Sequence, residues 1–416
     1  MHIFKTLCVA TLLTIAVSPS HAGLLEVLRD NGSISAQQYA ELSGEKKRAR
    51  AKASELRIVG RLYADFAHYQ EDETPLASGG ELRTARLQAK GKYRDNWKYK
   101  VQFSVEGDAL TSRYIWLGYQ FENSIVKVGR TAEANGMEDY TSSLYITFME
   151  RALPVTAFED DFAEGVEYNW WNNYSGLQVS ALLNNGKPSI LSSADENGDG
   201  VVDANDTISD SSADEKFKLS ARYSIAPLVS NDHIIHLGLH ANYVNPPDNT
   251  HRTRTRPESH VTDTRLLDSG ELNGVNGVSV SGIEFAWIGG PLSVQAEYLQ
   301  QDISIQGAQD INYDGFYIFG SYFISGHTRN YDAGSGTVGR TALNGKGAIE
   351  LALRYSSLDL GESNAGEGSN ITAGINWWPR SNIKLAFNQI FADFDMPGSA
   401  ADEHYGISQV RAQIDF

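Results

Sequence analysis

Apolar and polar residues alternate with a period of two along most of the chain. The stretch 97–106 shows this pattern most clearly, with five apolar residues on one face and polar residues on the other. The apolar face consists of Trp97, Tyr99, Val101, Phe103 and Val105. Because successive side chains of a strand point to opposite sides of a sheet, the pattern predicts β-strands. Its length of about ten residues suits a strand that crosses a membrane at a tilt.

Similar stretches recur from Leu56 onward. The clearest lie at 58–66, 115–121, 177–183, 216–225, 235–243, 292–298, 316–324, 349–355, 371–377 and 383–391. Counting them predicts an all-β fold, a transmembrane antiparallel β-barrel of about sixteen strands with an aqueous lumen. The sheet has to close, because an open edge in hydrocarbon leaves backbone groups unpaired at several kcal/mol each.

A soluble β-sandwich also alternates, and three features favour the barrel. Aromatic residues recur at strand ends, as expected for girdles at the two membrane interfaces. Tight turns alternate with long polar loops at 131–163, 185–213 and 245–275, and the alternation continues to the terminal Phe416. One polar stretch, 325–346, is long on the side where turns should be short, and the pattern offers no explanation for it.

Residues 1–22 are typical of a secretory signal peptide. Lys5 precedes an apolar stretch at 7–17, and Ser20-His21-Ala22 predicts cleavage after Ala22. The alternative is a buried N-terminal helix. The only cysteine, Cys8, lies in this segment, so the mature chain is expected to lack disulfides and thiolate metal ligands.

Residues 23–55 predict a short helical periplasmic segment ahead of the barrel at 56–416. Ser35 and Gln38 have the spacing of a capping box, which marks the start of a helix. A basic run follows at 46–52. This segment is expected to be a passive solvated leader. The alternative is that it contacts a trimer partner or an acidic cell-wall polymer.

The charge of the chain is acidic but unevenly distributed. The 52 Asp and Glu residues exceed the 35 Lys and Arg residues, which argues against nucleic acid as a partner. Basic residues nevertheless recur on the predicted inward faces. They are Arg57, Arg61, Arg86, Lys90, Lys98, Lys100, Lys127, Lys216, Lys218, Arg222, Arg354, Lys384 and Arg411, with Asp65, Glu106, Glu297 and Glu350 as a minority. Such a wall is expected to attract small anions. The alternative is that these side chains only hydrate the pore or bind interfacial headgroups, without selectivity.

Arg252, Arg254 and Arg256 form the sharpest local feature. Alternate residues of an extended segment point to the same side, so the three guanidinium groups are expected to form a ladder spaced by about 7 Å. The planar guanidinium fork suits phosphate oxygens better than lysine does. The alternative is an exposed basic loop without a function.

The loop 131–163 contains the stretch 141–151, which is too apolar for a freely solvated loop. We expect it to fold into the barrel and narrow the pore. The alternative is packing against a neighbouring subunit.

A calcium-binding pattern lies in the loop 185–213. It spans twelve residues with a turn glycine at the sixth position. The predicted ligands are Asp195, Asn197, Asp199, the Val201 carbonyl, Asp203 and Asp206. Bound Ca²⁺ would stiffen this outer loop, and the alternative is a merely acidic loop. The sequence contains no nucleophile elbow, zinc-ligand spacing or phosphate-cradling glycine loop, so no enzymatic activity is predicted.

Several stretches resemble the phosphate-selective porin O and P family. They are 145–154, 353–360, 374–379, 411–416 and the leader at 24–32. The resemblance implies a homotrimer of sixteen-stranded barrels that carries phosphate, pyrophosphate or similar anions. It also implies pore-lining roles for the arginine ladder in the fifth loop and for Arg83 and Arg86 on the second strand. Thr84 stands where the family often has an adjacent arginine. Strict alternation places Arg83 on the lipid side, unless a β-bulge intervenes.

The predicted protein is therefore a porin in the bacterial outer membrane, embedded in lipid. It is expected to pass small anions, with phosphate or polyphosphate as the best candidate, into the periplasm. One alternative is a porin with weak selectivity for other small anions or solutes. Another is a calcium-stiffened surface barrel used in adhesion.

Overall fold

The structure is a computed structural model of the chain. It describes residues 28, 34–41, 54–70, 74–106, 109–158, 162–184, 189–191, 216–230, 233–343, 345, 347–363, 365–396 and 402–416. The chain divides into two compact units, one of residues 1–55 and 92–95 and one of residues 56–91 and 96–416. In the first unit, residues 36–41 are helical. The predicted capping box is present there, since the Ser35 amide donates to Gln38 Oε1 at 2.9 Å and the Gln38 amide donates to Ser35 Oγ at 3.1 Å.

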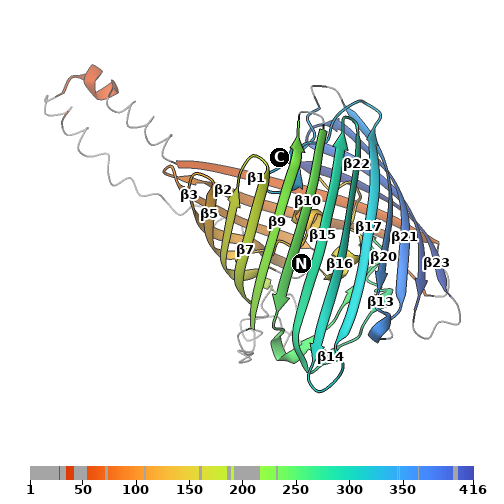
Figure 1. The fold of residues 1–416 in the computed structure, drawn as a ribbon. Helices are drawn as coiled ribbons and strands as arrows, with labels where there is room; N and C mark the ends of the chain where they lie inside the picture. The colour runs from red at the N-terminus through yellow and green to blue at the C-terminus, as the bar shows by residue number, and fades with distance from the viewer. Residues whose placement is uncertain are drawn as a thin grey trace, which may run out of the picture. The chain divides into compact units, whose positions relative to one another are not determined.

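Sixteen strands of the described chain form one closed antiparallel barrel (Figure 1). They are β1 (Ser54–Gln70), β2 (Gly79–Tyr93), β3 (Trp97–Glu106), β4 (Ala109–Gln120), β5 (Ser124–Thr131), β6 (Ala163–Trp171), β7 (Ser175–Asn184), β9 (Lys216–Val229), β10 (His233–Val244), β15 (Val275–Gly289), β16 (Leu292–Ile305), β17 (Ile311–Phe323), β20 (Ala348–Asp359), β21 (Glu367–Arg380), β22 (Ile383–Asp395) and β23 (Glu403–Asp415). The barrel closes where β1 pairs with β23, from Arg61 opposite Asp415 to Gln70 opposite Gly406. The predicted barrel and its strand number are confirmed.

The burial pattern of the strands is inverted relative to a soluble protein. On β9 the polar Lys218, Ser220 and Arg222 are buried, while Leu219 and Tyr223, which alternate with them, are exposed. Exposed apolar side chains such as Ile283 and Leu353 recur on the outer face of other strands. An apolar outer surface around a polar interior is the arrangement that a hydrocarbon environment requires.

Short turns join the strands at one edge of the barrel. Among them are the connections at 94–96, 121–123, 290–291 and 381–382. Aromatic side chains gather at this edge, where Trp97 contacts Tyr119 edge to face with ring centroids 5.2 Å apart. Trp377 lies exposed near the same edge. This arrangement fits the predicted interfacial girdle.

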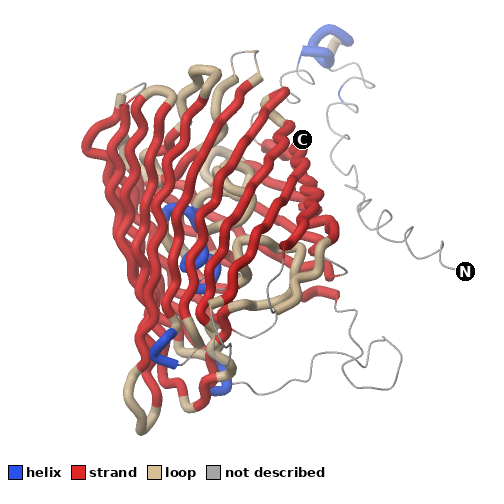
Figure 2. Tube along the Cα trace, turned by 90° about the vertical axis from the view of Figure 1, so that its right-hand side faces the viewer, coloured by secondary structure: helices blue, strands red, loops and turns tan. Residues whose placement is uncertain are grey.

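Three connections of the described chain fold into the barrel. The first, L3 (residues 132–162), carries α3 (Met137–Tyr140) and α4 (Leu153–Phe158), and Figure 2 shows these helical segments within the ring of strands. The second, L5 (residues 245–274), carries η1 (Pro247–Asn249) and two short ladders. These pair β11 (Thr250–His251) with β14 (Leu272–Asn273) and β12 (Arg254–Thr255) with β13 (Leu267–Asp268). The third is the turn hairpin (residues 324–347), in which β18 (Tyr331–Asp332) pairs with β19 (Thr337–Val338).

Two smaller elements complete the described chain. β8 (Ser189–Leu191) pairs with the start of β4, and η2 (Gly361–Ser363) lies between β20 and β21. No helix in the described part of the chain is long and apolar enough to cross a membrane.

Candidate anion pathway

L3 lies inside the barrel, as its apolar composition predicts. Phe148 is buried and contacts Phe319 of β17 edge to face, with ring centroids 5.6 Å apart. Polar side chains of the wall bind the L3 backbone, because Lys384 Nζ donates to the Ile146 carbonyl at 3.0 Å and Asn376 Nδ2 donates to the Thr147 carbonyl at 2.8 Å. L3 is therefore fixed to the wall by contacts that a solvated loop could not make.

Glu150 is the charged anchor of L3. It accepts two hydrogen bonds from Arg83, at 2.9 and 3.1 Å, and one from Arg411 Nη2 at 2.6 Å. Arg411 also donates to both carboxylate oxygens of Asp65, at 2.8 and 2.6 Å. Through Arg83 and Arg411, Glu150 thus joins L3 to β2 and β23, and Arg411 extends the connection to Asp65 of β1.

The alternation of β2 is irregular, which corrects the expected orientation of Arg83. Strict alternation places Arg83 on the lipid side, yet its guanidinium reaches Glu150 in L3 and therefore points into the lumen. Arg86 also points inward, since its Nε donates to the buried Ser104 Oγ at 3.2 Å. The outward-facing Leu82 and Leu87 lie an odd number of residues apart. An extra residue in the strand, as in a β-bulge, explains this spacing.

The arginine ladder of L5 (Arg252, Arg254 and Arg256) alternates with buried threonines, as predicted. Thr253 and Thr255 are fully buried, and Thr253 Oγ1 donates to Gln301 Oε1 on the wall at 2.5 Å. Arg252 and Arg254 are exposed on the opposite side of the segment, and Arg256 is partly exposed. The three guanidinium groups therefore share the face that points away from the wall.

Acidic side chains partly neutralise this ladder. Arg252 donates to both oxygens of Asp268, at 2.7 and 2.6 Å, and Arg256 Nη2 donates to Asp263 at 3.0 Å. Within the described part of the chain, Arg254 has no ion-pair partner. Sequence reasoning did not predict the two carboxylates, because their contacts depend on how L5 turns back on itself.

Arg265 completes a cluster of like charges. Burial, together with the charges of Arg256 and Arg254, lowers the pKa of Arg265 to about 10. The charges of Arg254 and Arg256 thus repel that of Arg265. An anion between the guanidinium groups would replace this repulsion with attraction.

Glu258 is a structural residue that sequence reasoning missed. Its carboxylate accepts hydrogen bonds from the Leu153 amide at 3.1 Å, from Thr372 Oγ1 at 3.0 Å and from Arg354 Nη2. Its backbone has a φ of 55°, in the left-handed region that non-glycine residues seldom adopt. The strained conformation lets one carboxylate join L5, L3 and the wall, and the surrounding contacts maintain it.

The turn hairpin accounts for the polar stretch that the pattern left unexplained. Arg222 Nη1 donates to the Ser335 carbonyl at 2.7 Å, and Tyr331 Oη lies 2.6 Å from His236 Nδ1. Arg329 is buried and pairs with Glu350 on β20. The hairpin thus folds into the lumen from the edge of short turns.

The predicted excess of cations in the wall is smaller than the strand pattern suggests. Lys127, Lys218, Arg222, Arg354 and Arg411 all pair with carboxylates. Several of these acids belong to loops that fold inward, and an alternation count of the strands cannot include them. Arg61 instead contacts the hydroxyl groups of Ser142 and Ser143 in L3, at 3.3 and 3.0 Å. The predicted calcium ligands at 195–206 lie outside the described residues.

Substitution of Gly136 by alanine is expected to destabilise the barrel by about 1–3 kcal/mol, through the positive φ of 97° and a steric clash. A Cβ at this position would lie 2.3 Å from Glu297 Oε2. Gly290→Ala is the control, because Gly290 also has a positive φ but its Cβ would meet nothing within 4 Å. Urea unfolding in detergent should show the larger loss for Gly136→Ala, and equal losses would contradict the clash.

These features define a porin, a closed barrel whose inward loops constrict a charged lumen. The family model of the phosphate-selective porin O and P family matches residues 56–416, and the chain belongs to that family. Porin O of Pseudomonas aeruginosa is 25% identical over 393 residues, which cover 83% of this chain and 84% of that protein. An uncharacterized protein of Caulobacter vibrioides is also 25% identical, over 361 residues covering 82% of this chain and 69% of that protein.

Solved structures share the fold at low identity. The anion-selective porin of Comamonas acidovorans superimposes with a TM-score of 0.55 at 13% identity, covering 87% of this chain and all of that chain. OmpT of Vibrio cholerae in its trimer form also gives a TM-score of 0.55 at 13% identity, covering 88% of this chain and all of that one. The match to the phosphate-selective porin family, together with the barrel, makes the chain an outer-membrane anion channel of the porin type.

Proposed function

We propose that the channel carries phosphate and related oxyanions such as pyrophosphate into the periplasm, past Arg254, Arg256 and Arg265. The cluster of these three guanidinium groups carries the proposal, because their mutual repulsion is relieved when a multivalent anion lies between them. The family to which the chain belongs is described as phosphate-selective, which supports the same substrate.

Ladder residues should contribute unequally. Arg252 is already hydrogen-bonded to Asp268, whereas Arg254 has no ion-pair partner among the described residues. A guanidinium without a counter-charge offers all of its donors to a passing anion. We therefore assign Arg254 the larger share of anion binding.

The proposal is tested by replacing Arg252, Arg254 and Arg256 together with alanine. Phosphate should block the chloride current of the parent channel in planar bilayers, and the triple variant should lose this block. Arg254→Ala alone should weaken the block more than Arg252→Ala. The exposed Arg380, at the edge of short turns, supplies the control Arg380→Ala, which should leave the block unchanged. Persistence of the block in the triple variant would remove the ladder from the pathway.

The acids beside the ladder favour a second candidate, a weakly selective porin. Asp268 and Asp263 offset two of the ladder charges. In that case the reversal potential in a salt gradient would show only a small anion preference, and phosphate would not block the current of the parent channel.

The proposed assembly is a homotrimer in contact with outer-membrane lipid. The trimer form of Vibrio cholerae OmpT, which shares the fold, supports this state. We also propose that the loop 195–206 binds calcium, and its support is the spacing of the acidic residues and the turn glycine.

A further inference from the structure

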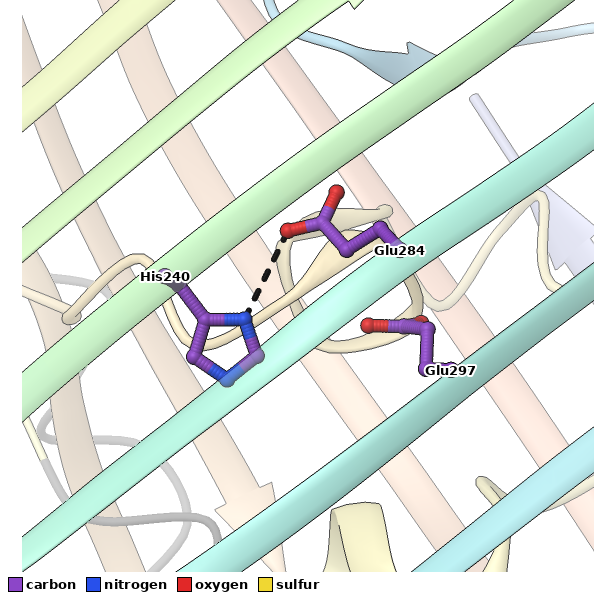
Figure 3. A group of neighbouring side chains, drawn as sticks. All are labelled: His240, Glu284 and Glu297. Atoms are coloured by element: carbon purple, nitrogen blue, oxygen red, sulfur yellow. Dashed lines mark ion pairs between the residues drawn. The ribbon is translucent and has the colours of Figure 1, made fainter.

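Three buried side chains meet on neighbouring strands of the wall. His240 of β10, Glu284 of β15 and Glu297 of β16 are each at most 3% exposed. One ligand atom from each lies within 4.8 Å of the other two (Figure 3). The pairing of β15 with β16 places Glu284 directly opposite Glu297. Two carboxylates in this position repel each other unless a positive charge lies between them.

Both carboxylates are held by neighbouring groups. Arg222 donates to both oxygens of Glu284, at 2.8 and 2.7 Å, and His236 Nε2 lies 3.0 Å from Glu284 Oε2. Glu297 accepts the amide protons of Met137 and Glu138 of L3, at 2.8 and 2.7 Å. Hydrogen bonds of this kind orient metal-binding carboxylates in proteins.

His240 lacks such partners. Neither ring nitrogen makes a hydrogen bond to the described residues, although the side chain is almost fully buried. Its Nδ1 lies 3.5 Å from Glu284 Oε1, and Figure 3 shows the imidazole turned toward that carboxylate with Glu297 alongside. A buried imidazole normally satisfies its nitrogens, so two unsatisfied nitrogens beside two carboxylates call for a ligand.

Glycines provide the space that this cluster occupies. A Cβ at Gly282 would lie 2.4 Å from His240 Cε1, and one at Gly238 would lie 2.4 Å from Glu284 Oε2. A Cβ at Gly136 of L3 would lie 2.3 Å from Glu297 Oε2 and 3.2 Å from His240 Cε1. Each of the three side chains therefore lies against a backbone position where any larger residue would displace it.

We propose that His240, Glu284 and Glu297 bind one divalent transition-metal ion of the zinc class. The imidazole nitrogen selects Zn²⁺ and its neighbours over Ca²⁺ and Mg²⁺, which take oxygen ligands. One His and two carboxylates fill three positions of a tetrahedral zinc site and leave the fourth for water. The ion replaces the repulsion between Glu284 and Glu297 with attraction. It also binds a His240 nitrogen that makes no hydrogen bond to the described residues.

The bound ion would stabilise L3, the loop that narrows the pore, and would not bind the permeating anion. Glu297 holds the start of α3 through two backbone amides, so an ion bound to Glu297 connects L3 to the strands β10 and β15. Bound metal is therefore expected to stabilise the position of L3. This role goes beyond the proposed passage of anions and does not depend on it.

Zinc uptake by the purified full chain tests the proposal directly. After equilibrium dialysis against Zn²⁺, elemental analysis should find one ion per chain, and the thermal unfolding midpoint in detergent should rise with Zn²⁺ concentration. His240→Gln and Glu297→Gln should each abolish this loading. His404→Gln is the matched control, because His404 and Asp393 form an exposed pair that could bind metal at the surface. It should keep the full loading.

A spectroscopic measurement covers the case in which the variants fail to fold. Co²⁺ added to the unmutated mature chain should give visible absorption bands of a nitrogen- and oxygen-ligated ion. X-ray absorption should find a single imidazole in the first coordination sphere. Less than one Zn²⁺ per chain, loading that survives His240→Gln, or a coordination sphere without imidazole would each overturn the proposal.

Discussion

Replacement of Arg411 by alanine is expected to lower the free energy of unfolding of the barrel by about 3–5 kcal/mol, because it leaves buried charges without their partner. Arg411 is buried and bridges Asp65 and Glu150. Without it, Asp65 loses both of its hydrogen bonds from the guanidinium, while Glu150 keeps Arg83. Asp65 therefore accounts for most of the expected loss.

Urea unfolding of the folded barrel in detergent measures this effect. Arg380→Ala removes the same side chain at an exposed site and should change the free energy of unfolding by less than about 1 kcal/mol. The double variant Asp65→Leu with Arg411→Leu should be more stable than Arg411→Ala, because it removes the buried carboxylate together with its partner. A loss at Arg411 no larger than that at Arg380 would contradict the bridging role.

Removal of the turn hairpin is expected to raise the single-channel conductance several-fold. In this variant a two-residue Asn-Gly turn replaces residues 328–341, so the segment that contacts Arg222 and His236 leaves the lumen. Ion flow through a wide barrel is set by its constrictions, and the variant removes one of them.

Tyr331→Phe is the control for the hairpin variant. It keeps the hairpin and most of the ring volume but loses the hydroxyl that contacts His236. Its conductance should match that of the parent channel. A folded hairpin variant with parental conductance would show that ions do not pass the hairpin.

The strands and the inward fold of L3 were predictable because local pattern determines them. Alternation marks every strand that has lipid on one side and polar groups on the other. The stretch around Phe148 is too apolar for water, which indicated burial before any contact was known. The capping box was predictable for the same reason, because Ser35 and Gln38 are only three residues apart in the sequence.

The inward fold of L5 and of the turn hairpin could not be predicted in this way. Both segments are polar, so they resemble solvated loops, although the lumen wall they contact is polar as well. Glu258 shows the difficulty, since its partners Leu153, Arg354 and Thr372 are far away in sequence and meet only inside the closed barrel. The irregularity in β2 was an open alternative in the sequence, because an extra residue changes the face of Arg83 without changing the composition.

The closing seam of the barrel has a consequence for assembly in the membrane. Asp65 of β1 and Arg411 of β23 are direct register partners, so the first and last strands have to meet before this ion pair can form. The same arginine binds Glu150, which positions L3. Closure of the barrel and the final positioning of L3 are therefore coupled. A chain in which β1 and β23 have not yet paired would lack both the closed wall and the contact from Arg411 that holds Glu150.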